Sequence, residues 1–321
     1  MERLIGHDEA WAIWRAARVG QRMHHGWILA GREGLGKARF ARAAAADLVA
    51  EPGVPQPPIG AHPDIHVLEP LPSSEDEAKK RDEGKAYNRK RNISVDQIRG
   101  VQRRLVTRPT LGARRAVIID AADDLEKGAV NALLKSLEEP PEGTFFLLVT
   151  HQIGRLLPTV RSRCTVLRFQ PLAPDDMARA LAAEAPQLGG AALEAAIAAG
   201  SGAPGAALAF AELNLGGAWQ IMARLAAEGD TDLALRGELS SSLGPRPDRE
   251  RLLAVVEAAR RVLVEAMAHS NDAKRLKIVE AHAALSSLAA QVPTYNFEPA
   301  LLLLEIGGLL ASVARTRESA A

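Results

Sequence analysis

The chain contains a single cysteine, Cys164, among its 321 residues. It can therefore form no disulfide within itself and no zinc site built from several cysteines. Aromatic residues make up only 4%, so aliphatic and small side chains must fill the core. The net charge of +1 predicts no avid nucleic-acid or membrane surface. The longest apolar run, Leu301–Leu310, is interrupted by Glu305 and is too short to span a bilayer. Residues 1–8 show no signal-sequence pattern, so we expect a cytoplasmic protein with no membrane partner.

The first half of the chain alternates between short apolar runs and helix-like segments. This alternation is typical of a parallel sheet with crossover helices. The run Arg115–Asp120 is apolar at its centre, as expected of a strand buried on both faces. We predict five strands at or near Ile28–Gly31, Asp64–Leu68, Arg115–Asp120, Phe145–Thr150 and Val166–Phe169.

The second half of the chain has no strand-like pattern. Helices separated by Gly and Pro take over after Phe169, and apolar residues recur at helical spacing from Leu252 to Met267. The predicted fold class is therefore α/β followed by all-α. We predict three domains: an α/β domain over residues 1–170, a small helical domain over 171–216 and a larger helical domain over 217–321.

A charged segment, residues 73–92, interrupts the α/β domain. Acidic residues come first and mostly basic residues follow, and the apolar content is too low for the segment to fold alone. We expect a solvated, mobile insertion. A basic arm that touches DNA is the alternative interpretation.

The most informative motif is a phosphate-binding loop at Gly31–Ala38, which follows an apolar run and precedes an Ala-rich helix. Gly31, Gly34 and Gly36 let backbone N–H groups approach a phosphate, and the helix N-terminus adds partial positive charge. Lys37 would reach the terminal phosphates. The next position should carry a hydroxyl that binds Mg²⁺, and Ala38 has none.

A second part of an ATPase site is also incomplete. Asp120 ends the third predicted strand, where an acid would hold Mg²⁺ through water. ATP-hydrolysing proteins of this broad class place a glutamate next, as the base that activates water, and this chain has Ala121. Loss of a positioned base typically lowers the rate by ~10²–10⁴. We therefore expect no hydrolysis, although Asp123 is an alternative base.

An arginine pair follows the fourth predicted strand, at Arg161 and Arg163. An arginine beyond a nucleotide-binding sheet can insert into the ATP site of a neighbouring subunit, and such a residue contributes ~10³–10⁵ in rate. Surface ion pairs are the simpler interpretation of two loop arginines. The position of these two after a degenerate ATP site favours the catalytic one.

Taken together, these motifs resemble those of the delta-prime subunits of the bacterial DNA polymerase III clamp loader, which belong to the AAA+ family. The matching strings are His24–Leu29, His62–Asp64, Ile93–Arg99, Asn131–Pro141 and Leu156–Cys164. The resemblance is strong over residues 1–170. It implies an AAA+ domain, a helical lid and an oligomerising collar. It also implies that Arg163 is the arginine that acts in trans and that Thr150 occupies a polar sensor position.

The resemblance implies a function as well. It is that of a non-hydrolysing accessory subunit of the polymerase holoenzyme, which supports the loading of the sliding clamp on primed DNA. The partners would be the gamma/tau motor subunits and the delta subunit, with the clamp and DNA reached through the complex. Two alternatives stay open: a slow but genuine ATPase motor subunit, and a regulatory subunit that senses nucleotide.

Two departures from the family pattern bear on cofactors. Many relatives carry a four-cysteine zinc module, but Glu51–Ala61 holds no cysteine, so we expect no zinc or other metal site. The two histidines His62 and His66 suit packing or hydrogen bonds better. The lid string Gly200–Ala207 lacks the arginine that contacts ATP in active relatives. ATP is therefore not required, and its binding is left open.

Overall fold

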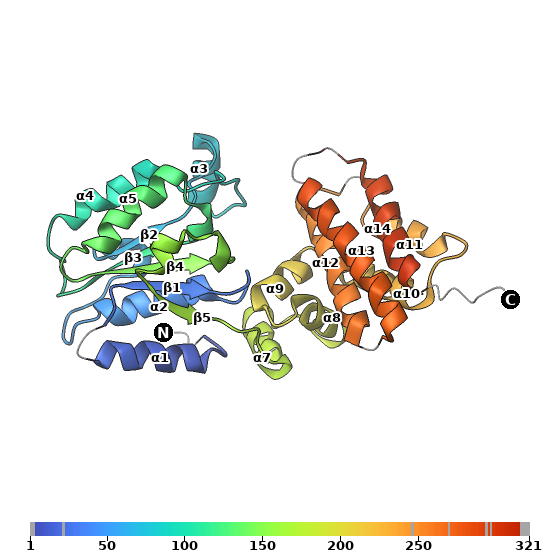
Figure 1. Ribbon diagram of the computed structural model, residues 1–321, viewed down its shortest axis with the longest axis horizontal. Coiled ribbons are helices and arrows are strands. Elements are labelled where there is room, and N and C mark those ends of the chain that lie inside the picture. Colours follow the sequence, from blue (N-terminus) through green and yellow to red (C-terminus); the bar gives the residue numbers. More distant parts are fainter. Residues whose placement is uncertain are drawn as a thin grey trace. The chain divides into compact units, whose positions relative to one another are not determined.

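The computed structural model describes residues 4–20, 23–244, 247–268, 270–292, 295 and 297–314. The chain forms two compact units, which divide between Leu172 and Ala173 (Figure 1). Among the described helices, none combines the length and the apolar character needed to cross a membrane.

The first unit is built on a five-stranded sheet in the order β2-β3-β4-β1-β5. Every strand pair is parallel, so all strands begin at one edge of the sheet and end at the other. All five predicted strands are confirmed. Their bounds are Gly26–Ala30 (β1), Ile65–Leu68 (β2), Arg115–Ile119 (β3), Thr144–Thr150 (β4) and Thr165–Arg168 (β5). The central strands β1 and β3 are buried along their whole length, which explains their unbroken apolar character.

Helices cover both faces of this sheet (Figure 1). Side chains alternate between faces along a strand. Ile28 of β1 therefore joins a core formed with α4 and α5. On the other face, Trp27 contacts Trp14 of α1, with ring centroids 5.3 Å apart. The helices of this unit are Asp8–Val19 (α1), Lys37–Val49 (α2), Glu75–Asp82 (α3), Val95–Leu105 (α4), Lys127–Glu138 (α5) and Pro158–Arg161 (α6), with 3₁₀ turns at Ile59–Ala61 (η1), Ala122–Asp124 (η2) and Ile153–Arg155 (η3).

The charged insertion contains a helix that its composition does not predict. Ser74 caps α3 by accepting a hydrogen bond from the backbone of Glu77. A backbone hydrogen bond from Ser73 to Asn88 closes the segment at its base. No residue of α3 is buried. Local capping and ion pairs thus take the place of an apolar face, and the mobility of residues 73–92 stays a prediction.

The second unit is entirely helical in its described part. The apolar positions from Leu252 to Met267 fall within one helix, and the predicted succession of helices is confirmed. Their bounds are Pro174–Glu184 (α7), Gly190–Gly200 (α8), Pro204–Glu212 (α9), Gly216–Glu228 (α10), Ala234–Ser242 (α11), Arg249–Ala268 (α12), Asp272–Gln291 (α13) and Pro299–Ala314 (α14). Within this unit α7–α9 contact one another and α10–α14 form a second bundle. The division into lid and collar at residue 216 stays a prediction.

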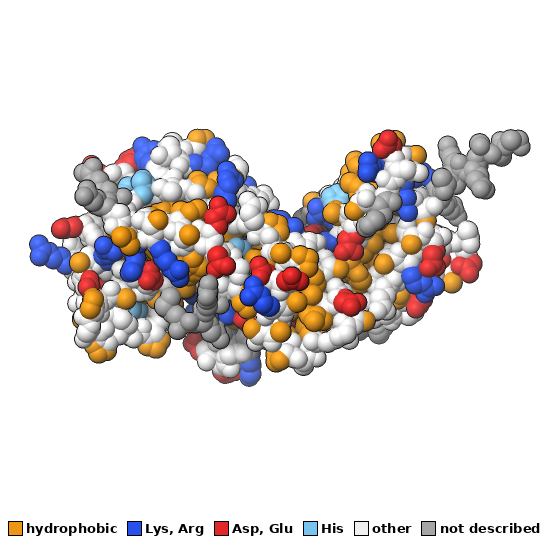
Figure 2. All heavy atoms as spheres, turned by 90° about the horizontal axis from the view of Figure 1, so that it is seen from below, with side chains coloured by type: hydrophobic (Ala, Val, Ile, Leu, Met, Phe, Trp, Pro, Cys, Tyr) orange, Lys and Arg blue, Asp and Glu red, His pale blue; other side chains and the backbone are white. Residues whose placement is uncertain are grey.

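Charged side chains of both signs occur together on one face of the molecule. On the face drawn in Figure 2, Lys and Arg lie among Asp and Glu and do not gather into one field. This agrees with the small net charge.

Candidate functional site

The phosphate-binding loop lies at the carboxyl edge of the sheet, between β1 and α2. Gly34 and Gly36 have φ values of 78° and 80°, a conformation that strains any residue with a Cβ. Gly36 is also the residue at which α2 is capped. Gly31 is constrained by space, because a Cβ there would lie 2.7 Å from the carbonyl oxygen of Phe169. The sequence thus forms a loop of the predicted kind, with the N-terminus of α2 directed toward it.

Lys37, the first residue of α2, is only 2% exposed. Its Nζ donates to the carbonyl oxygen of Arg32 at 2.5 Å and lies 3.1 Å from Nδ1 of His151. Burial lowers the pKa of Lys37 from 10.5 to about 8, against the opposing effect of Glu33 and Asp120. The ammonium group is therefore held by contacts within the protein, to Arg32 and His151.

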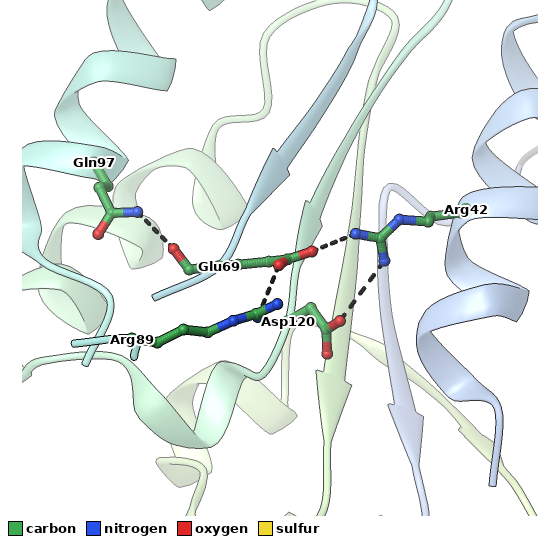
Figure 3. Close-up of polar contacts among 5 residues, drawn as sticks. All are labelled: Arg42, Glu69, Arg89, Gln97 and Asp120. Carbon is green, nitrogen blue, oxygen red and sulfur yellow. Dashed lines mark hydrogen bonds and ion pairs between the residues drawn. The ribbon is translucent and has the colours of Figure 1, made fainter. Parts of the chain in front are cut away.

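Asp120 is part of an ion-pair network at the same edge (Figure 3). Its carboxylate lies 3.8 Å from the guanidinium of Arg42 on α2, and Arg42 also pairs with Glu69. Glu69 in turn accepts from Arg89 of the insertion at 2.9 Å. Its backbone carbonyl accepts from Gln97 of α4 at 2.8 Å. The network therefore connects the phosphate-loop helix, two strand ends and the insertion.

Burial raises the pKa of Asp120, and the nearby carboxylate of Glu69 adds to this effect. The cations Arg42 and Lys37 oppose it. Asp120 thus lies beside the phosphate loop, as the sequence predicts for the acid of an NTPase site.

Asp123 has a different environment. Its carboxylate accepts the hydroxyl of Thr150 at 2.7 Å. It also accepts the backbone N–H groups of His151 and Gln152, at 2.6 and 3.3 Å. Ala121, which stands in the position of the catalytic glutamate, is 5% exposed. The carboxylate of Asp123, two residues after Ala121, is thus engaged in joining η2 to the end of β4.

Arg163 lies at the opposite edge of the sheet. It comes two residues before β5, and its carbonyl oxygen is 3.0 Å from the position that a Cβ on Gly26 would occupy. Gly26 is the first residue of β1, whereas the phosphate loop follows the last. The guanidinium of Arg163 pairs with Glu138 at 2.7 Å and donates to the carbonyl of Thr159 at 3.0 Å. The structure thus brings Gly31, Gly34, Gly36, Lys37, Asp120 and Thr150 to one edge and leaves Arg163 at the other.

The histidines and the cysteine have structural contacts. His62 is buried, contacts Gln56 at 2.8 Å and accepts the backbone N–H of Asp64. Burial lowers the pKa of His66 and raises that of Cys164 to about 12. In the described part of the chain, no three His, Cys, Asp or Glu side chains are grouped so that they could hold a metal ion.

Comparison with known families shows which family the chain is similar to. The model of the family described as DNA polymerase III, delta subunit, matches residues 6–173, slightly more than half of the chain. The chain belongs to this DNA polymerase III subunit family.

Relatives within and around the family are similar over the same region. The DNA polymerase III subunit delta' of Pseudomonas aeruginosa is 35% identical over 164 residues, 48% of this chain and 45% of the relative. That of Escherichia coli is 36% identical over 50% of this chain and 42% of its own length. The gamma/tau subunit of Mycobacterium tuberculosis is 30% identical over 67% and 37%. The predicted resemblance to delta-prime subunits is confirmed, while the matched segments cover less than half of each relative.

The fold is shared with a solved structure. A DNA polymerase III gamma subunit-related protein from Thermotoga maritima superposes with a TM-score of 0.55, over 96% of this chain and all of the other, at 18% identity. At this identity the likeness concerns the fold alone. The predicted fold class, an α/β domain on a parallel sheet followed by an all-α part, is confirmed.

Several residues of the site carry no recognisable signal in the sequence. Arg42, Glu69 and His151 meet the predicted residues only through contacts between distant segments. Glu138 differs from these residues, because its position in the sequence indicates that it needs a partner. A carboxylate in the last turn of a helix opposes the helix dipole, so a compensating cation is expected nearby.

Proposed function

We propose that this chain is a non-hydrolysing subunit of a DNA polymerase III clamp loader and that Arg163 completes the ATP site of a neighbouring subunit. The observation that supports this proposal most directly is the separation of Arg163 from the chain's own phosphate loop. The five residue-to-residue steps from Gly26, at the start of β1, to Gly31, just after its end, span about 16 Å at ~3.3 Å each. Arg163 is held at the far end of that span by Thr159 and Glu138. It therefore suits a site on another molecule and not its own.

The arrangement around Lys37 supports the absence of hydrolysis. Ala38 supplies no metal ligand and Ala121 supplies no base. Asp123, the alternative base, has its carboxylate engaged by Thr150 and two backbone N–H groups. A general base needs a free lone pair directed at the attacking water. This geometry disfavours the alternative of a slow ATPase motor.

The family supports the assembly part of the proposal. Relatives named delta', gamma and gamma/tau are subunits of DNA polymerase III. We propose that the partners here are the gamma/tau motor subunits and the delta subunit. Through them the complex would act on the sliding clamp and primed DNA. The cytoplasmic location stays a prediction.

The test compares two arginines that lie two positions apart. Arg163→Ala and Arg161→Ala remove the same charge, and for Arg161 no ion pair is seen among the described residues. Each variant is assembled with the motor and delta subunits, and DNA-dependent ATP turnover and clamp loading are measured. We expect Arg163→Ala to assemble normally and to lose ~10³-fold or more at the neighbouring site. The ATP turnover of the whole complex should then fall by the fraction of turnover that the neighbouring site contributes.

The Arg161→Ala complex should turn over ATP at the unmodified rate. Equal turnover in the Arg163→Ala complex would refute the donation in trans. A loss of assembly in either variant would be seen first by native mass measurement of the complex.

A nucleotide-sensing role is a second candidate, favoured by the conformation of the loop. Gly34, Gly36 and the N-terminus of α2 retain the geometry that holds a phosphate. Such binding would occur without cleavage and would depend little on Mg²⁺, because Ala38 lacks the hydroxyl. Calorimetric titration of the chain with ATP, in Mg²⁺ and in EDTA, tests it.

A further inference from the structure

We propose that Glu138 is a positioning residue, which fixes the guanidinium of Arg163 in the orientation needed by the neighbouring ATP site. This inference rests on the proposed donation of Arg163 in trans. It adds a residue from a separate segment of the chain, the last residue of α5, to the arginine itself.

Two contacts hold the guanidinium from different sides. Nη2 of Arg163 lies 2.7 Å from Oε1 of Glu138, and Nη1 donates to the carbonyl oxygen of Thr159 at 3.0 Å. A weaker contact of 3.5 Å joins Nη1 to the hydroxyl of Ser162. A guanidinium has five N–H donors in a planar fork. Three of these donors are engaged by Glu138, Thr159 and Ser162, so two remain for a phosphate while both terminal nitrogens stay anchored.

Glu138 is itself fixed by the end of α5. The preceding residue, Leu137, is 1% exposed and belongs to the core of the first unit. Its carbonyl oxygen accepts a 2.9 Å hydrogen bond from Nε2 of His25. Pro140 and Pro141 follow, and a proline disfavours helix at the residue before it. Helix α5 therefore ends at a defined residue, and the backbone that carries the Glu138 carboxylate is held rigidly.

Arg163 has a rigid support as well. Val160, three residues earlier, is 2% exposed, and Cys164 packs against the same core as Leu137. The Sγ of Cys164 lies 2.8 Å from where a Cβ on Gly26 would be. The residue before β5 is therefore in close contact with the start of β1. Both ends of the ion pair are thus tied to one core, and the pair transfers that rigidity to the guanidinium.

Stability alone does not account for this pair. The side chains of Arg163 and Glu138 are 34% and 49% exposed, and ion pairs in such positions contribute little to folding. Glu138 also stands where the helix dipole disfavours a carboxylate. Orientation has a larger effect, because an arginine side chain has many rotamers and a displacement of about 1 Å at a reacting centre can cost 10²-fold in rate.

The test is a double-mutant cycle in the assembled complex. Glu138→Gln, Arg163→Ala and the double variant are compared by DNA-dependent ATP turnover. Glu139→Gln is the matched control, since it removes the adjacent exposed carboxylate, for which no partner is seen in the described structure. We expect Glu138→Gln to lower kcat at the neighbouring site about 10- to 100-fold. The KM for ATP, the assembly and the thermal melting of the subunit should be unchanged, and so should the rate with Glu139→Gln.

Because Glu138 acts through Arg163, the double variant should be no slower than Arg163→Ala alone. The positioning role is overturned if Arg163→Ala slows turnover while Glu138→Gln does not. It is also overturned if the two losses multiply in the double variant. If Arg163→Ala itself has no effect, the proposed function fails instead, so the two failures are distinguishable.

Discussion

The hydroxyl of Thr150 donates a 2.7 Å hydrogen bond to the carboxylate of Asp123 and so joins the end of β4 to the turn after β3. This bond gives Asp123 a structural role at the point where the sequence allowed a catalytic one. The backbone N–H of His151 supports the same carboxylate at 2.6 Å. His151 also contacts Lys37. Asp123 is therefore connected to the phosphate loop through His151.

Replacing Asp123 should therefore affect folding more than any chemistry. Asp123→Asn presents an NH₂ group to donors and loses charge-assisted bonds, each of which is worth about 1.5–3 kcal/mol. We expect the free energy of unfolding to fall by about that much, measured by urea denaturation. Asp124→Asn is the control. Burial and the charge of Asp123 raise the pKa of Asp124, so its neutralisation should be tolerated. Equal stability of the two variants would contradict the structural role of Asp123.

Lys37 should make stability depend on pH. Its folded-state pKa of about 8 lies below the ordinary 10.5, so below pH 8 both states carry the proton and the folded state bears the cost of burying it. Between pH 8 and 10.5 the folded lysine loses its proton first, and stability rises. The difference corresponds to at most about 3 kcal/mol. The unfolding free energy of the unmodified chain should rise relative to Lys37→Met between pH 7 and 10. A parallel pH dependence in the two proteins would show that Lys37 is not desolvated.

Magnesium should have little effect on any nucleotide binding by this chain. Ala38 removes the hydroxyl ligand, so ATP affinity measured by calorimetry should be similar in Mg²⁺ and in EDTA. Ala38→Thr restores the ligand beside Asp120 and should make binding tighter in Mg²⁺ only. A strong effect of Mg²⁺ on the unmodified chain would contradict the reading of this loop as metal-independent.

Glu69 should control how firmly the insertion is attached. It pairs with Arg89 of the insertion and with Arg42 of α2. Glu69→Gln removes the charge that holds both, so hydrogen–deuterium exchange in residues 73–92 should become faster. The three side chains are partly exposed, so the loss of global stability should stay within about 1 kcal/mol. Glu83→Gln, which breaks the exposed pair with Lys85 within the insertion, is the control and should leave exchange at the base unchanged.

The insertion also bears on the alternative of a DNA-binding arm. Of its basic residues, Lys79, Lys80, Arg81, Lys85 and Arg89 each pair with an acidic side chain. These pairs are exposed and weak, so they leave the alternative of a DNA-binding arm open.

The sequence was informative wherever one physical rule dominated. Apolar runs marked the central strands most clearly, because a central parallel strand is buried on both faces, whereas the edge strands β2 and β5 are only partly buried. The helices of the second unit followed from apolar spacing and from Pro and Gly at their ends. The helix α3 has no apolar face, so periodicity could not reveal it, although Ser74 carries the cap that stabilises it.

The site was predictable residue by residue but not as an arrangement. The glycines, Lys37 and Asp120 were recognised because their spacing along the chain carries the chemistry. The hydrogen bonds of Asp123 to β4 and the pair between Glu138 and Arg163 link segments about 25 residues apart. Neither partner can be identified from local pattern, although the position of Glu138 at a helix end indicates that a cation lies nearby. The position of Arg163 at the opposite edge does follow, once every strand is known to be parallel.

The central claim is that this chain contributes an arginine to its neighbour's ATP site and no hydrolysis of its own. Its most direct test is DNA-dependent ATP turnover by two complexes that differ only in this subunit, one with Arg163→Ala and one with Lys37→Met. The account predicts that turnover falls with Arg163→Ala and is unchanged with Lys37→Met. A loss of turnover with Lys37→Met, together with normal turnover with Arg163→Ala, would contradict it.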